Sequence, residues 1–367
     1  GDVYKRQGPL NMGTNIFAFV IVLGVLIFFH ELGHFLVARL FGVGVERFSL
    51  GFGPRIFGRK IGITDYRISA VPLGGYVKMI GEEPDAEVDP ADVPISFTHK
   101  HVFKRFLIVA AGPAFNILLA VLIFYGIFQI SGTVILKPII GEAQSGTPAQ
   151  AAGLAKGDEI LSIDGRAVES WDEMATIIAA SKGAPLEVTF RRDGMNQNVT
   201  VPPELKTTKN IFGEDIPRYV IGITAAGEVF TKKLSPLGAM SESVVQTYNI
   251  AELTVVSVAK IIQGTVSTKT IGGPIMIAEL AGQQAKLGAT NLLFFIALIS
   301  VNLAILNVLP IPVLDGGHLL FFLIEMIIGK PVNIRVREVA QQAGMFVLIL
   351  LMIFVFYNDI TRIFSGQ

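Results

Sequence analysis

One apolar segment near the N-terminus, Val20 to Val43, carries three ionisable side chains in its middle. It reads VIVLGVLIFFHELGHFLVARLFGV and places His30, Glu31 and His34 in a stretch long enough to cross a bilayer. Each ionisable group costs roughly 2.5 to 3.5 kcal/mol at the centre of a membrane helix. Three on one turn need a strong compensating interaction, and a divalent metal ion supplies it. The alternative is a buried polar network that only stabilises helix packing.

The spacing of these residues indicates which chemistry the segment performs. Positions i and i+4 share one helix face, so His30 and His34 can hold a single ion with Glu31 beside it. H-E-x-x-H is the metalloprotease pattern, in which the glutamate is the general base. Catalytic zinc takes three protein ligands, and the chain has no cysteine. Asp315, in NVLPIPVLDGGH, is the first candidate for the third ligand, and His318 is its chief competitor.

Composition predicts an integral membrane protein. Hydrophobic residues make up 51% of the chain and charged residues only 16%. Four segments have the character of membrane spans: about 15 to 42, 105 to 130, 291 to 328 and 343 to 358. Prolines and paired glycines interrupt the third span, so its broken backbone should line an enclosed or wet cavity. Acidic and basic residues balance, which argues against a nucleic-acid partner.

Basic residues predict the orientation in the membrane. The 43–104 segment holds eight Lys and Arg residues, and the short 329–342 loop holds three. Lys and Arg favour the cytoplasmic side, so both segments should be cytoplasmic and the large 131–290 region outside. We therefore expect a multi-pass protein of the bacterial inner membrane whose soluble domain is periplasmic or extracellular.

Two regions between the spans predict β-structure. Residues 48 to 81 indicate short strands separated by Gly and Pro, with a free edge for an extended peptide. The 146–168 stretch GTPAQAAGLAKGDEILSIDGRAV resembles the bacterial PDZ domain, which binds peptide termini beside a strand and a helix. We expect the strand near 134–140 and the helix at 171–181, opened by a Ser170/Glu173 capping box, to form that site. The alternative is a spacer that binds nothing.

Downstream of this domain, an apolar stripe at helical spacing predicts an amphipathic helix on the membrane surface or, preferably, packed on protein. The stripe comprises Val244, Tyr248, Ala251, Val255, Val258 and Ile262. The predicted segments are 1–11, a scar or disordered stretch; 12–43, the first span; 44–104, a membrane-reentrant β region and cytoplasmic loop; 105–131, the second span; 132–206, the PDZ domain; 207–290, a linker and amphipathic helix; 291–328, the broken third span; 329–342, a cytoplasmic loop; and 343–367, the fourth span and tail.

Five stretches together resemble one family, the site-2 intramembrane metalloproteases of peptidase family M50, and its bacterial branch of sigma-E regulators. They are HELGHFLVA (30–38), GGYVKMIGE (74–82), GPAFN (112–116), the PDZ pattern and ISVNLAILNVLPIPVLDGGHLL (299–320). The resemblance implies that His30, His34 and Asp315 bind zinc and that Glu31 activates water. It also implies that the substrate helix, once unwound, is positioned by four residues, namely Asn302, Asn307, Pro310 and Pro312. The 48–81 region corresponds to a membrane-reentrant loop thought to pair with substrate.

The function this predicts is a zinc endopeptidase that cuts the transmembrane segments of single-span proteins within the lipid bilayer. Anti-sigma factors and remnant signal peptides are the expected substrates in regulated intramembrane proteolysis. Well-known members carry two PDZ domains, whereas one pattern is found in this sequence. A noncatalytic scaffold that recruits partners through its PDZ domain is the alternative function. Metal transport is disfavoured because no path of carboxylates or histidines is present.

Overall fold

The computed structural model of the protein describes residues 12–82, 88–266 and 272–365, and the chain divides into two compact units. The first unit, the membrane unit, comprises residues 1–127, 240–259 and 267–367. The second, the β-rich unit, comprises residues 128–239 and 260–266. Residues 1–11, predicted to be a scar or disordered, lie outside the described residues, as does the end of the predicted tail.

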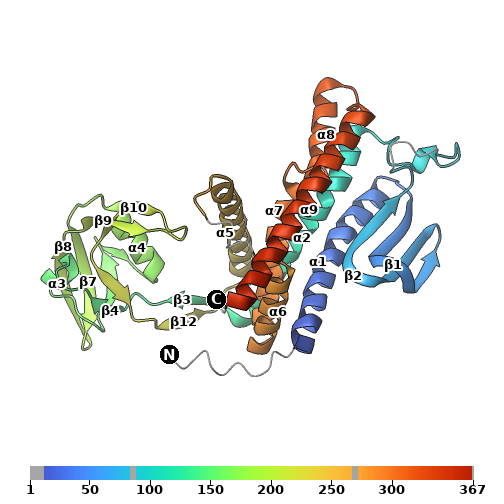
Figure 1. Ribbon diagram of the computed structural model, residues 1–367. Helices are drawn as coiled ribbons and strands as arrows, with labels where there is room; N and C mark the ends of the chain where they lie inside the picture. The colour runs from blue at the N-terminus through green and yellow to red at the C-terminus, as the bar shows by residue number, and fades with distance from the viewer. Residues whose placement is uncertain (1–11, 83–87, 267–271, 366–367) are drawn as a thin grey trace. The chain divides into compact units, whose positions relative to one another are not determined.

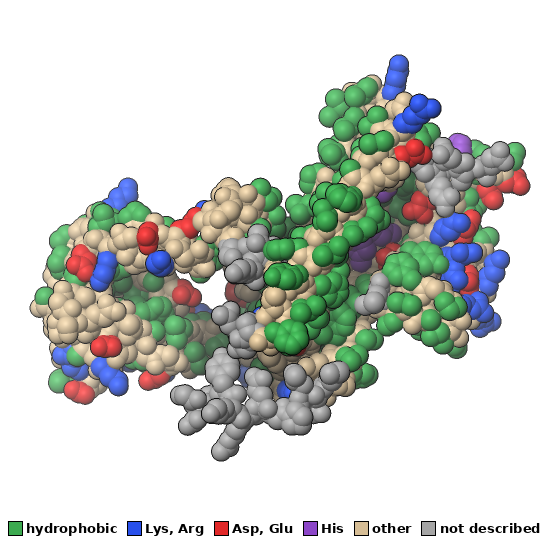
Figure 2. Space-filling model, viewed as in Figure 1, with side chains coloured by type: hydrophobic (Ala, Val, Ile, Leu, Met, Phe, Trp, Pro, Cys, Tyr) green, Lys and Arg blue, Asp and Glu red, His purple; other side chains and the backbone are tan. Residues whose placement is uncertain are grey.

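Within the described residues, four helices are long and apolar enough to cross a membrane (Figure 1). They are α1 (Met12–Leu40), α2 (Val102–Ser131), α7 (Ala289–Val308) and α9 (Ile334–Ser365). Only 11% of the apolar stretch of α9 is buried by protein, and Figure 2 shows hydrophobic side chains covering its outer surface. Apolar surface of this extent requires lipid around it. These four helices fit the predicted class, a polytopic α-helical membrane protein.

The third apolar segment is interrupted where the sequence carries prolines and glycines. Helix α7 ends at Val308, and the chain resumes as α8 (Asp315–Ile328). Between them the N–H of Ile311 donates to the carbonyl of Leu309 at 2.7 Å, which closes a tight turn. A side chain at Gly316 would collide with that same carbonyl. The glycine therefore lets the turn fold directly onto the first residue of α8.

A long β-hairpin lies along α1 (Figure 1). Its strands are β1 (Val45–Ile61) and β2 (Thr64–Met79). The first half of β1 lies between two parts of β2, because Phe48 pairs with Val77 on one side and with Tyr66 on the other. The last part of β2, Gly75–Met79, is consequently paired on one side only. Its buried side chains join a core shared with α1, α2 and α8.

Two further helices precede α7 in the chain. Helix α5 (Pro236–Ile262) carries the predicted apolar stripe, but four of its six positions are exposed: Val244, Tyr248, Val255 and Ile262. The predicted packing of this stripe on the soluble domain stays a prediction. The buried face of α5 instead presents Ser243, Thr247 and Ile250, and the Ser243 and Thr247 hydroxyls bond to carbonyls of their own helix. Because the hydroxyls of Ser243 and Thr247 are already hydrogen-bonded, this face of α5 can pack closely against other residues. The larger apolar side chains of the helix then face outward.

Helix α6 (Pro274–Leu287) was not predicted from the sequence. A buried carboxylate from α9 caps its N-terminus. Asp359, 1% exposed, accepts hydrogen bonds from the N–H groups of Gly273, Ile275 and Met276 at 2.9, 2.9 and 3.2 Å. These are N–H groups that the first turn of a helix cannot satisfy itself. Since Gly282 of the same helix packs against Asn15 of α1, Asp359 ties the last span to the first through α6.

The β-rich unit surrounds a separate apolar core that includes Ile140, Ile160, Met174 and Phe190. Helix α4 (Trp171–Ala180) begins as predicted, with Ser170 accepting from the Glu173 N–H at 3.1 Å. The main sheet has the order β6-β5-β7-β8, and the pairs β10-β9, β11-β4 and β12-β3 complete the unit. The predicted PDZ domain spans 132–206, and three later strands of this unit, up to Lys232, each pair with an earlier strand.

The remaining elements have the following bounds: η2 (Val93–Ile95), β3 (Thr133–Leu136), β4 (Ile140–Ala143), α3 (Pro148–Ala151), β5 (Glu159–Ile163), β6 (Arg166–Ala167), β7 (Leu186–Arg192), β8 (Met195–Val201), β9 (Glu204–Lys209), β10 (Asp215–Val220), β11 (Ile223–Ala225) and β12 (Val229–Lys232).

Replacing Asp359 with alanine should lower the free energy of unfolding by about 1 to 3 kcal/mol, because three N–H groups lose their acceptor. The measurement is thermal unfolding of the purified chain in detergent. Asp359→Asn, which keeps one acceptor oxygen, should lose less. Equal unfolding temperatures for Asp359→Ala and the parent chain would contradict the capping role.

Candidate metal centre

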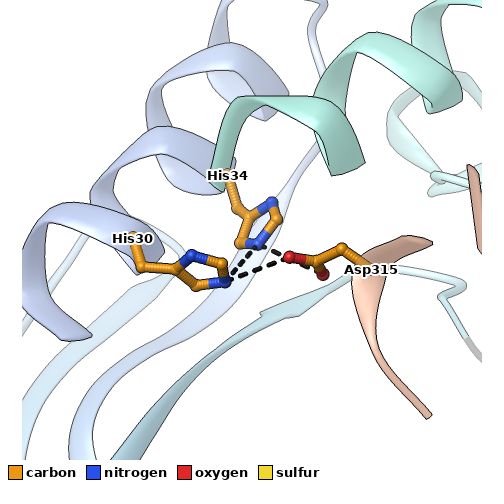
Figure 3. Close-up of side chains that lie close together, drawn as sticks. All are labelled: His30, His34 and Asp315. Atoms are coloured by element: carbon orange, nitrogen blue, oxygen red, sulfur yellow. Dashed lines mark hydrogen bonds and ion pairs between the residues drawn. The ribbon is translucent and has the colours of Figure 1, made fainter. Parts of the chain in front are cut away.

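Three potential ligand side chains converge from opposite ends of the chain (Figure 3). Nε2 of His30 lies 3.2 Å from Nε2 of His34 and 3.2 Å from Oδ2 of Asp315. Nε2 of His34 lies 3.6 Å from Oδ1 of the same carboxylate. The histidines occupy successive turns of α1, and Asp315 is the first residue of α8. One ligand atom from each residue lies within 4.8 Å of the others, a set that can hold a metal ion.

Glycines bring α2 close enough to α1 to press the imidazoles together. A side chain at Gly33 would collide with the Ala111 carbonyl of α2, so the helices touch through their backbones there. A Cβ on Gly112 would collide with Nε2 of His34 and lie 2.8 Å from Cε1 of His30. The absence of a side chain at Gly112 is therefore a condition for the two rings to occupy these positions.

A backbone carbonyl orients one of the two rings. Nδ1 of His34 lies 2.9 Å from the Ile108 carbonyl, which can only accept a hydrogen bond. The ring proton is thus on Nδ1, and Nε2 keeps its lone pair toward His30 and Asp315. Metal-binding histidines are held in this way, by a hydrogen bond from the ring nitrogen that does not bind the metal.

The donor set fits zinc. Two imidazole nitrogens and one carboxylate are a typical three-ligand set for catalytic zinc, with the fourth position open. Oδ2 of Asp315 is buried and has no hydrogen-bond partner. A buried carboxylate oxygen without a partner is costly, and a cation at this point would remove the cost. Among the described residues the cluster contains Asp315 and not His318, its competitor from the sequence.

The cluster opens into a cavity of about 270 Å³. Figure 2 shows histidine atoms inside a hollow of the surface. Lining residues include Glu31, Glu82, Arg105, His318 and Arg337, together with the one-sided strand segment Gly75–Met79. Any side chain at Gly75 would lie 2.6 Å from Cγ2 of Ile27 and 3.1 Å from Cγ of Glu31. Glycine there allows the strand to run directly beside Glu31.

The four residues expected to position substrate do not line this cavity. Asn302 lies on α7, where its Oδ1 is 2.7 Å from the Thr254 hydroxyl of α5. Asn307, Pro310 and Pro312 lie at the end of α7 and in the following turn, and Pro312 packs against Gly317 and Gly344. The structure thus brings together His30, Glu31, His34 and Asp315, and leaves the other four outside the cavity wall.

An ion pair that no sequence motif indicates joins Arg105 of the cavity wall to Glu325. Nη2 of Arg105 lies 2.6 Å from Oε1 of Glu325, and both side chains are mostly buried. The two residues belong to α2 and α8, so the pair joins the helix that supports the histidines to the helix that carries Asp315. The separation of the two residues in the sequence gives no local signal for the contact.

The β-rich unit contains a second cavity, of about 490 Å³. One wall is α4, with Trp171, Met174 and Ile178, and the other is the segment 218–223, which runs from the end of β10 to the start of β11. The predicted strand at 134–140 does not line this cavity, because β3 pairs with β12 instead. Any peptide bound against α4 in this cavity would therefore lie beside residues 218–223.

The chain is similar to known proteins along most of its length. The model of peptidase family M50 matches residues 18–351. A protein of Mesorhizobium japonicum, named provisionally as a zinc metalloprotease, is 36% identical over 95% of this chain and 99% of its own length. Zinc metalloprotease RasP of Geobacillus kaustophilus is 32% identical over 95% of this chain and 98% of its own. A solved PDZ domain of an SdrC-like protein from Listeria monocytogenes covers 24% of this chain and 84% of its own at 23% identity, but its TM-score of 0.20 carries no argument.

Gly112→Ala should weaken zinc binding. The added methyl group would overpack the contact with the two histidines, which costs about 1 to 3 kcal/mol. If the histidines move apart to relieve this clash, zinc affinity falls roughly 5- to 150-fold. Zinc content and affinity of the purified chain are the measurements. Gly126→Ala, on the same helix with open space around the new methyl group, is the matched control. Equal zinc affinity in the two variants would show that zinc binding does not require the space beside Gly112.

Proposed function

This chain belongs to peptidase family M50, and from that premise we propose that it is an intramembrane endopeptidase that cuts transmembrane segments of single-span proteins. Its matched relatives are zinc metalloproteases, so the enzyme class is that of a zinc metalloendopeptidase. One observation carries the proposal: two imidazoles and a carboxylate converge beside Glu31 between helices that are apolar enough to cross a bilayer.

We assign zinc to the site of His30, His34 and Asp315, with Glu31 as the general base. Zinc held there would supply Lewis-acid polarisation of the scissile carbonyl and of the attacking water. The Glu31 carboxylate, one residue along α1 from His30 and at the cavity wall, takes the proton of that water. It then returns the proton to the leaving nitrogen, so the same side chain serves both halves of the hydrolysis.

The strand edge beside Glu31 favours an extended substrate over a helical one. Peptide bonds inside a helix are already hydrogen-bonded to one another, so a helical substrate has no free backbone groups to pair with that edge. The segment Gly75–Met79 pairs with β1 on one side only and runs beside Glu31, and its Met79 N–H donates to Oε2 of Glu82 at 3.1 Å. A substrate strand added there would displace that contact and recover hydrogen bonds lost on unwinding.

Further assignments follow from the family resemblance. Substrates would be anti-sigma factors or remnant signal peptides, cut within the bacterial inner membrane, with the β-rich unit on the periplasmic or extracellular side. Asn302, Asn307, Pro310 and Pro312 would position the unwound substrate. Because Oδ1 of Asn302 accepts from the Thr254 hydroxyl, a substrate N–H that donates to this oxygen would share or displace that contact. The 490 Å³ cavity beside α4 would receive peptide termini, as a PDZ domain does.

A noncatalytic scaffold is the second candidate, favoured by that same cavity in the β-rich unit. It requires neither Glu31 nor a complete ligand set, both of which the membrane unit contains. The two functions differ in whether Glu31 is needed for turnover.

Glu31→Gln should abolish cleavage of a single-span reporter, by about 10² to 10⁴-fold, while zinc stays bound, because the ligands are untouched. Metal analysis and reporter cleavage are measured on the same preparations. Asp315→Ala should instead lose zinc and activity together. Turnover by Glu31→Gln at the rate of the parent chain refutes the protease assignment and leaves the scaffold.

Substrates with weaker helices should be cut faster. Replacing one Ala by Gly beside the scissile bond costs a helix about 1 kcal/mol, which favours the unwound state roughly fivefold. Reporter cleavage should rise by up to that factor. The same Ala→Gly change two turns away serves as the control. A rate that does not respond to either substitution contradicts unwinding as a requirement.

A further inference from the structure

Asn116 is a fully buried residue of α2 whose side chain lies on the outer side of His30. Its Nδ2 is 3.4 Å from Nδ1 of His30, the ring nitrogen opposite the one that faces Asp315. The Asn116 backbone carbonyl accepts a hydrogen bond from the Ser300 hydroxyl at 2.8 Å. Asn116 is therefore held by α7 and contacts the metal centre only through His30, since it does not line the cavity.

The two histidines differ in what fixes their protons. His34 faces the Ile108 carbonyl, which can only accept a hydrogen bond. His30 faces the side-chain amide of Asn116, whose NH2 can donate and whose oxygen can accept, and the two ends have nearly the same shape. With Nδ2 toward the ring, Nδ1 accepts, and the ring proton sits on Nε2 where a metal must bind. With Oδ1 toward the ring, Nδ1–H donates and Nε2 is free for zinc.

Among the described residues, no other group forms a hydrogen bond that holds the amide in one orientation. Oδ1 of Asn116 is buried without a hydrogen-bond partner. Either orientation leaves one end of the amide unpartnered, so the bond to His30 decides between them. A cation on Nε2 polarises the ring and makes Nδ1–H a stronger donor, which favours Oδ1 as its acceptor.

We propose that Asn116 is a positioning residue, which accepts the Nδ1–H of His30 and so fixes the ring tautomer that binds zinc. The inference rests on the proposed zinc site. Hydrogen-bond partners of this kind typically change metal affinity ten- to hundred-fold when removed. The GPAFN stretch thus contributes twice, with Gly112 making room for the rings and Asn116 orienting one of them.

The test measures zinc affinity of the purified full chain by competition with a chelator. Asn116→Leu, similar in size but unable to accept, should bind zinc ten- to hundred-fold more weakly. Asn116→Asp restores an acceptor and should bind within about threefold of the parent chain or tighter. Ser300→Ala, which removes the backbone contact but leaves the amide, should match the parent chain. Parent-like affinity in Asn116→Leu, or equal losses in the Leu and Asp variants, overturns the proposal.

A spectroscopic readout covers the case in which Asn116→Leu does not fold. Cobalt in place of zinc reports the donor strength of each ligand through its visible bands. A carboxylate on Nδ1–H makes His30 a stronger donor, so Asn116→Asp should shift those bands, and Ser300→Ala should not. Unshifted bands in Asn116→Asp overturn the proposal. A parent chain that binds neither ion would instead sink the zinc site itself, so the two failures are distinct.

Discussion

The convergence of two imidazoles and a carboxylate at one point is the constraint on which the membrane unit depends. A carboxylate oxygen of Asp315 is buried there without a hydrogen bond, in a segment where ionisable groups are expensive. A cation held by the three side chains would offset that cost and join the first span to the start of α8. It would then contribute to packing as well as to chemistry, and the Arg105–Glu325 pair makes a second link between the helices around the site.

Close approach of backbones explains why glycines surround this centre. Gly33 and Gly112 bring α1 and α2 together, Gly75 brings the strand edge to α1, and Gly316 folds the proline turn onto α8. Each lies where a Cβ would meet a neighbouring backbone, side chain or ligand. Small residues at helix contacts are the usual solution in lipid, where apolar side chains gain little by leaving the solvent. The site is consequently positioned by helix and strand backbones.

Much of the architecture and part of the site could be predicted from patterns within single segments of the sequence. Spacing alone predicted His30, Glu31 and His34 on one helix, and apolar length predicted the four long helices, because both depend on neighbours in sequence. Asp315 could be singled out only with help from the family resemblance, since His318 satisfied the same local criteria. The doubled-back hairpin, the exposed stripe of α5 and the partner of Asn116 depend on which distant segments pack together. No periodicity within one segment contains that information.

The arrangement of the ligands along the chain has a consequence for biogenesis. The ribosome completes the helix with both imidazoles long before it makes α8, and α9 follows later still. A nascent chain therefore passes through the insertion machinery with two rings and no acid to complete the ion's shell. On the proposed function, cleavage cannot begin until α8 has been made. The synthesis of α8, which begins with Asp315, is the step that brings the third potential ligand to the two imidazoles.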